Sequence, residues 1–258
     1  MKIISLSRSF TEILENFGRA SELAGVTDHC PELAGDPARV GSPKSLRFEV
    51  IESLHPDLIL ADARENRFEE IQALQKKYRA VSFDVRSVNQ AMEAVRAIGR
   101  LTGALEESEG LVSEIAEEYR LCKLEKDLPR VRALILLWNI PLLTVNFDTY
   151  ISRVIEAGGG LNVFHADPLP EFAIELEDMI EKDPEILFLP TDPFPFKKKD
   201  IKRFRQYRIL SKIPIELVEG RLFSYFGPAT AEALRFFRQV FEKVRPCQPK
   251  VYLSDAHP

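Results

Sequence analysis

The chain has 258 residues, of which 45% are apolar, and a net charge of −5 from 40 acidic and 35 basic residues. This length allows one large domain or two smaller ones, and a chain of this size builds a core without a disulfide or metal staple. The acidic balance argues against a protein that binds nucleic acid through charge, because such a protein needs a basic face. Three widely spaced cysteines, Cys30, Cys122 and Cys247, predict neither a disulfide framework nor a structural zinc site.

The N-terminal segment does not have the pattern of a leader peptide. One lysine, Lys2, precedes a short apolar stretch that runs into Ser7, and neither an apolar region of secretory length nor a small-residue cleavage site follows. No stretch approaches the ~18 consecutive apolar residues of a membrane span, so we expect no membrane insertion. As the sequence stands we expect a cytoplasmic protein. A periplasmic or cell-surface location is the alternative if a leader precedes Met1.

Residues 1–86 alternate between buried-strand and amphipathic-helix patterns. Short apolar runs predict strands, and apolar residues at helical spacing between them predict helices, one of which we expect Ser45 to cap. This alternation predicts a parallel sheet with helices on both faces. The expected strands are 3–6, 23–26, 57–61 and 80–83, and the expected helices are 11–17, 46–54 and 68–77.

A helical pattern without strands follows in residues 88–124. Apolar residues recur every three or four positions from Met92 to Tyr119, and no proline interrupts them. The pattern predicts one long amphipathic helix, with Gly103 and Gly110 as the positions where it would bend. Such a helix would be roughly 50 Å long, which is enough to bridge two lobes. We therefore expect residues 87–126 to form a bridging helix.

Residues 127–258 resume the alternating pattern and predict a second lobe. The apolar run from Val131 to Trp138 is typical of a central strand. We expect an α/β fold of two Rossmann-like lobes with parallel sheets, joined by a single long helix, with a ligand cleft between the lobes. The further expected strands are 185–189 and 213–218, and the expected helices are 148–157, 176–182, 201–207 and 229–244.

Patterns of catalysis and metal binding are weak. Gly158–Gly160 follow a helix instead of opening one, and no dinucleotide fingerprint, P-loop or nucleophile elbow is present, so we predict no enzyme activity. A closed zinc site needs about four ligands, and neighbouring side chains diverge. We therefore predict no metal site. The alternative set of metal ligands is His29, Cys30 and His165.

Three loops of the second lobe are rich in aromatic residues and proline. They follow the strand ending near Trp138, follow the strand ending at Leu189, and precede the last helix. In α/β sheets, ligands bind beyond the carboxyl ends of strands, and exposed aromatic rings there offer a flat apolar surface to a large planar ligand. The candidate contacts in these loops are Trp138, Asp192, Phe194, Phe196, Tyr225 and Phe226.

In order and spacing, several segments together resemble the helical-backbone (class III) solute-binding proteins of ABC importers, specifically the cobalamin-binding branch. Residues 3–14 look like that family's first strand, ligand loop and helix, and residues 25–30 look like its second strand and loop. The resemblance covers nearly the whole chain. The remaining matching segments are 39–42, 51–61, 157–164 and 183–189.

The resemblance implies two lobes that close on one bulky ligand, with cobalamin or a related corrinoid or tetrapyrrole as the bound molecule and no covalent cofactor. It places Ser7, Arg8, Asp28 and His29 at the ligand as contacts from the first lobe. We expect a monomer that binds a small-molecule ligand and no nucleic acid. The alternative is a cytoplasmic protein that binds a metal or metal chelate, or a chelatase-like enzyme, because such proteins share a related architecture.

The resemblance also implies a membrane partner. In importing relatives, one acidic residue on each lobe docks onto basic pockets of the ABC transporter membrane subunits. The corresponding residues here are Glu69 or Glu70 in the first lobe and Glu177 in the second. Opposite charges at such a rim steer association and fix orientation.

Overall fold

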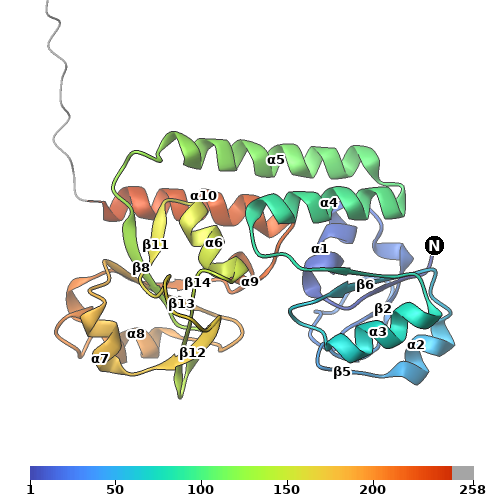
Figure 1. Ribbon diagram of the computed structural model, residues 1–258, viewed down its shortest axis with the longest axis horizontal. Helices are drawn as coiled ribbons and strands as arrows, with labels where there is room; N and C mark the ends of the chain where they lie inside the picture. The colour runs from blue at the N-terminus through green and yellow to red at the C-terminus, as the bar shows by residue number, and fades with distance from the viewer. Residues whose placement is uncertain (246–258) are drawn as a thin grey trace, which may run out of the picture.

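The computed structural model describes residues 1–245, so Cys247 and His257 lie outside the described residues. Two α/β lobes lie side by side (Figure 1). Three long helices run along one side of them: α4 (Val88–Thr102), α5 (Leu105–Leu124) and α10 (Pro228–Val244). None of the helices within residues 1–245 combines the length and apolarity needed to cross a bilayer.

The first lobe is built on a five-stranded parallel sheet with the order β3-β2-β1-β6-β7. Ile3 and Ile4 in the central strand are fully buried in different clusters, because successive side chains of a strand point to opposite faces. The strands are β1 (Ile3–Ser5), β2 (Leu23–Val26), β3 (Ala38–Arg39), β6 (Leu58–Asp62) and β7 (Ala80–Phe83), and the helices are α1 (Arg8–Asn16), η1 (Ala20–Glu22), α2 (Phe48–Leu54) and α3 (Phe68–Lys77).

Ser45 does not cap a helix. It lies in β5 (Ser45–Leu46), which pairs antiparallel with β4 (Gly41–Ser42). Gly41 has a φ of 101°, and a Cβ there would lie 2.4 Å from the Ser45 carbonyl oxygen, so the hairpin needs glycine at this position. The hairpin delays the start of α2 to Phe48.

The predicted bridging helix is in fact two helices, α4 (Val88–Thr102) and α5 (Leu105–Leu124), which pack against each other as an antiparallel pair. Gly103 ends α4 with a left-handed φ of 73°. Gly99 allows the close approach, because a Cβ there would lie 2.2 Å from Ser108 Oγ. The prediction of a single helix was therefore wrong: α4 leads away from the second lobe, and α5 returns to it (Figure 1).

The second lobe holds a four-stranded parallel sheet, β11-β8-β13-β14, and a small antiparallel sheet, β12-β10-β9. The predicted strand 131–138 splits between them: β8 ends at Ile135, and Trp138 begins β9. The strands are β8 (Val131–Ile135), β9 (Trp138–Asn139), β10 (Leu142–Val145), β11 (Gly160–Asn162), β12 (Glu171–Ile174), β13 (Ile186–Pro190) and β14 (Ile215–Val218), and the helices are α6 (Tyr150–Ala157), α7 (Leu176–Glu181), α8 (Lys198–Phe204), η2 (Leu210–Lys212), α9 (Arg221–Ser224) and α10 (Pro228–Val244).

One hydrophobic cluster continues from the first lobe through the long helices into the second. It includes Phe10 of α1, Ile98 of α4, Ile115 of α5 and Phe237 of α10, all of them fully buried. The two parallel sheets draw their strands from residues 3–83 and 131–218. The boundaries expected at residues 86 and 126 stay predictions.

Candidate ligand site between the lobes

The lobes face each other through loops that follow the carboxyl ends of their parallel strands. In the first lobe these loops follow β1 and β6, and in the second lobe they follow β13 and precede α10. This is the edge at which α/β sheets bind ligands. We call the polar residues that face each other here the interlobe junction: Ser7, Arg8, Asp62, Glu65, Asp192 and Tyr225.

A chain of hydrogen bonds crosses the junction. Arg8 Nη1 of the first lobe donates to the Tyr225 hydroxyl at 3.4 Å, and that hydroxyl donates to Asp192 Oδ2 at 3.1 Å. The Arg8 guanidinium carbon also lies 5.0 Å from the centre of the Tyr225 ring, within cation–π range. Burial raises the pKa of Tyr225, and the Asp192 carboxylate raises it further, so the hydroxyl keeps its proton and acts as a donor to Asp192.

Asp192 is held by the backbone around it. A Cβ on Gly220 would lie 2.5 Å from Asp192 Cβ, and the Gly220 N–H donates to Thr191 Oγ1 at 3.1 Å. Glycine therefore lets the turn after β14 press directly against the loop after β13. The sequence predicted that the loop after β13 contacts the ligand. The contact with Gly220 shows how that loop is positioned.

Two carboxyl groups of the first lobe complete the junction, and neither was predicted. Burial raises the pKa of Asp62 to about 6, with a smaller contribution from Asp84. Burial also raises the pKa of Glu65 to about 7; Asp62 and Asp192 raise it further, while Ser7 and Lys44 lower it. Asp62 is the last residue of β6 and Glu65 lies in the loop after it, so the rule that ligands bind beyond the carboxyl ends of strands also applied to them.

Ser7 is fully buried at the N-cap of α1. Within residues 1–245 its hydroxyl has no hydrogen-bond partner of good geometry, but it lies close enough to Glu65 to lower the pKa of that carboxyl. Buried hydroxyl groups are normally satisfied. The Glu65 carboxyl is the acceptor that lies beside this hydroxyl.

The predicted aromatic residues fall into two groups. Trp138, Phe194 and Phe196 form a chain of edge-to-face rings with centroid separations of 5.3 and 4.7 Å. Trp138 is 40% exposed at one end of this chain, and Phe196 is buried at the other. Phe226 instead lies in the shared core, where its ring packs against Phe10 of the first lobe at 5.5 Å.

The remaining predicted contacts of the first lobe lie after β2. Asp28 accepts two hydrogen bonds from Arg47, at 2.6 and 2.7 Å, so its charge is already paired. His29 is exposed. Cys30 is buried, with its sulfur 3.4 Å from Thr11 Oγ1.

His165 is not brought to His29 and Cys30. Its Nδ1 lies 2.5 Å from Glu156 Oε1 within the second lobe. Among residues 1–245, no group of three or more histidine, cysteine, aspartate or glutamate side chains is arranged to hold a metal ion.

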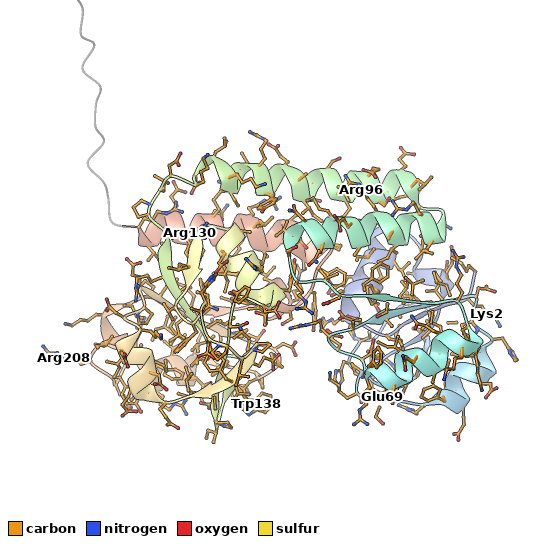
Figure 2. The ribbon with its side chains drawn as sticks, viewed as in Figure 1. Lys2, Glu69, Arg96, Arg130, Trp138 and Arg208 are labelled. Atoms are coloured by element: carbon orange, nitrogen blue, oxygen red, sulfur yellow. The ribbon has the colours of Figure 1, made fainter. Side chains whose placement is uncertain are left out.

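The three glutamates predicted to dock a transporter differ in their surroundings. Glu69 is exposed on α3, and Glu177 is exposed on α7. Glu70 turns inward, and its Oε1 accepts a hydrogen bond from the Leu46 N–H at 3.2 Å. Figure 2 shows Glu69 on the side of the first lobe that faces away from the long helices, and α7 of the second lobe lies on that same side.

Comparison with known proteins supports this architecture. The vitamin B12-binding protein of Vibrio vulnificus is 26% identical over 196 residues, which is 73% of this chain and 70% of the relative. The vitamin B12-binding protein of Pectobacterium carotovorum is 24% identical over 234 residues, covering 88% of this chain and 83% of the relative.

Solved structures show the same fold. The periplasmic vitamin B12-binding protein of Vibrio cholerae superimposes with a TM-score of 0.80 at 19% identity, covering 94% of this chain and 97% of that one. A periplasmic heme-binding protein from Roseiflexus gives a TM-score of 0.78 at 20% identity, covering 94% and 98%. Residues 3–215 match the periplasmic binding protein family, and the chain belongs to that family.

Proposed function

We propose that the protein binds a corrinoid of the cobalamin class between its two lobes and does not change it chemically. The observation that carries this proposal is the interlobe junction, where hydrogen bonds join loops of both lobes at the carboxyl ends of their strands, while Trp138 lies exposed against Phe194 of the same second-lobe loop that holds Asp192. The vitamin B12-binding relatives support the choice of ligand.

The charges of the junction favour cobalamin over haem. Cobalamin carries amide side chains, whose N–H groups need acceptors, whereas haem carries propionate groups, which need cations. Asp62, Glu65 and Asp192 supply acceptors. The nearby cations keep their charge but each donates to a neutral group of the protein: Arg8 to the Tyr225 hydroxyl, Lys44 to the Arg64 carbonyl at 3.1 Å, and Arg64 to the Asp148 carbonyl at 3.0 Å.

Calorimetric titration with cyanocobalamin and with haemin tests this choice. We expect cyanocobalamin to bind with a Kd below about 10 μM and haemin to bind at least about tenfold more weakly. Trp138 is the only tryptophan of the chain, so quenching of its fluorescence reports a ligand on its side of the junction. Absence of cyanocobalamin binding at about 50 μM would refute the proposal.

A matched pair of variants locates the site. Tyr225→Phe removes the hydroxyl that links Arg8 to Asp192 and is expected to change cyanocobalamin affinity by about three- to tenfold. Tyr207→Phe removes a hydroxyl from an exposed tyrosine near the end of α8 and should leave affinity unchanged. Equal behaviour of the two variants would place the ligand elsewhere.

We further propose that Glu69 and Glu177 dock the protein on the membrane subunits of an ABC importer. Their exposure supports this role, and the hydrogen bond of Glu70 to Leu46 argues against Glu70. Glu69→Lys with Glu177→Lys is expected to abolish binding to a reconstituted vitamin B12 importer of the same organism in low salt, with cyanocobalamin affinity unchanged. Wild-type docking by this variant would contradict the role.

The compartment decides between delivery to an importer and storage. Ligand capture is possible on either side of a membrane, whereas docking on an importer requires the outer side. A protein confined to the cytoplasm would be a ligand carrier or sensor. Fractionation of the native cells separates these two roles.

A further inference from the structure

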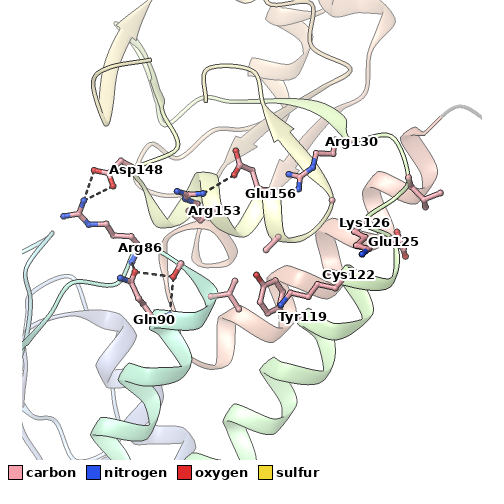
Figure 3. A pocket seen from close by; sticks show the side chains of 16 residues that line it. Arg86, Gln90, Tyr119, Cys122, Glu125, Lys126, Arg130, Asp148, Arg153 and Glu156 are labelled. Carbon is pink, nitrogen blue, oxygen red and sulfur yellow. Dashed lines mark hydrogen bonds and ion pairs between the residues drawn. The ribbon is translucent and has the colours of Figure 1, made fainter. Parts of the chain in front are cut away.

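A cavity lined by no residue of the interlobe junction lies beside the start of α4, on the side of the long helices. Its volume is about 540 Å³, which is enough for a small molecule. Figure 3 shows it between the start of α4, the second half of α5 and α6. Its lining includes Arg86, Gln90, Lys123, Lys126, Arg130 and Asp148.

The acidic groups of this cavity are already paired. Asp148 accepts two hydrogen bonds from Arg86, both at 2.8 Å, and Glu125 lies 2.6 Å from Arg245 Nη1. Glu156 lies against His165 and 3.8 Å from Arg153. The acidic side chains therefore contribute little net negative charge to the space.

Three cations of the cavity have no such partner. Within residues 1–245, Lys123, Lys126 and Arg130 form no ion pair with a carboxylate. The Lys123 ammonium lies 4.0 Å from the centre of the Tyr119 ring, and Arg130 Nη1 donates only to the Gly160 carbonyl, at 3.3 Å. These groups leave several N–H donors free to bind an anion.

The start of α4 adds to the positive potential in this cavity. Ser87 is the N-cap, and its hydroxyl accepts the Gln90 N–H, while Arg86, Ser87, Val88 and Gln90 all line the cavity. The N-terminus of a 15-residue helix carries partial positive charge, which favours an anion. Lys123 of α5, Lys126 and Arg130 of the segment that follows it, and the N-terminus of α4 thus line one cavity from different parts of the chain.

We propose that this cavity binds a small multivalent oxyanion, a molecule with phosphate groups or several carboxylates. The site is separate from the interlobe junction and does not depend on cobalamin being the ligand there. Because Arg86 ties the start of α4 to Asp148 of the second lobe, the anion would bind where the connection between the lobes begins.

Calorimetry with inorganic pyrophosphate and with citrate, in low salt, tests the site. We expect at least one of them to bind with a Kd below about 1 mM. Tighter binding of pyrophosphate identifies phosphate as the preferred group, and tighter binding of citrate identifies carboxylate. Failure of both to bind at about 10 mM would overturn the proposal.

Two triple variants with the same charge change separate a built site from general attraction. Lys123→Gln, Lys126→Gln and Arg130→Gln are expected to weaken binding by at least about tenfold. Lys198→Gln, Lys199→Gln and Lys202→Gln remove three exposed cations of α8 and should weaken it by less than about twofold. Equal losses would show that binding follows net charge alone.

Hydrogen exchange gives a second readout that does not depend on the variants. Anion binding is expected to slow exchange in residues 86–90 and 119–130. Slowed exchange at residues 62–67 and 190–196 instead would mean that the anion occupies the interlobe junction, and the assignment to this cavity would be wrong.

Discussion

The contact between the lobes combines a close-packed apolar part with a polar part. On the side of the long helices, Phe226 of the second lobe packs against Phe10 of the first, and Gly227 lies so close to Ile13 that a Cβ would approach it to 2.5 Å. On the side of the loops, the contact is polar. Arg8 of the first lobe, for example, donates a hydrogen bond to the Tyr225 hydroxyl of the second.

This difference indicates which side moves. Close-packed apolar surfaces have no alternative partner in water, so separating them loses the full free energy of burial. A hydrogen bond in a polar contact can be exchanged for one to water or to a ligand at a small net cost. We therefore infer that the apolar side is the pivot and that the polar side opens to admit a ligand.

Phe226→Ala tests the apolar side and should have the largest effect. Removing this buried ring is expected to lower the free energy of unfolding by about 3–5 kcal/mol, because it leaves a cavity in the core shared by both lobes. Urea unfolding measures the loss. Phe68→Ala, which truncates a ring that is 67% exposed, is the control and should change it by less than about 0.5 kcal/mol. A loss below about 1 kcal/mol for Phe226→Ala would mean that the lobes do not share this core.

The pH dependence of stability tests the polar side. Because the pKa of Glu65 is raised from 4.5 to about 7, the folded protein holds a proton on Glu65 between these values that the unfolded chain has released. The stability associated with this proton is fully present below pH 4.5 and is lost as the pH rises through 7. Burial is the main cause, and the carboxylates of Asp62 and Asp192 add to it.

Glu65→Gln should therefore gain stability relative to the wild type as the pH rises from about 4 to about 8, by about 1–2 kcal/mol. Unfolding at several pH values gives this difference directly, and the exposed Glu69→Gln should show a flat difference. A difference for Glu65→Gln that does not change with pH would show that its carboxyl is solvated and that the loops do not face each other closely.

The sequence predicted most strands and helices because short buried runs, such as residues 58–61, are bounded by clear turn signals. It missed the reversal at Gly103 because Leu101 and Leu105 stay four residues apart across the turn, so the helical period continues unbroken. The apolar faces of α4 and α5 both pack into the same hydrophobic cluster. Periodicity therefore could not distinguish one helix from two.

The candidate site was predictable only in part, because a sequence pattern does not show which way each side chain of a loop points. Tyr225 and Phe226 are neighbours in one predicted loop, yet the structure places Tyr225 in the polar junction and Phe226 in the shared core. The sequence shows that aromatic residues gather after a strand, but it does not show which ring points inward. Asp62 and Glu65 lacked an aromatic signal, and only their position at the carboxyl end of β6 could have indicated them.

Arg64→Ala tests the outer edge of the polar side and should have the smallest effect on stability. Arg64 Nη2 donates to the Asp148 carbonyl oxygen of the second lobe at 3.0 Å, and this contact is exposed. Exposed polar contacts contribute about 0–1 kcal/mol, so urea unfolding should barely change. Hydrogen exchange should nevertheless become faster in residues 62–67 and 146–149, since one link that holds these loops together is gone.

Exchange in residues 226–241 decides whether the two sides behave differently. If the apolar side is the pivot, these residues keep their slow exchange in Arg64→Ala while the loops open. Arg67→Ala is the matched control, because Arg67 is exposed in the same loop and forms no ion pair among the described residues. Faster exchange on both sides in Arg64→Ala would mean that the lobes separate as a whole, and the assignment of the helical side as a fixed pivot would be wrong.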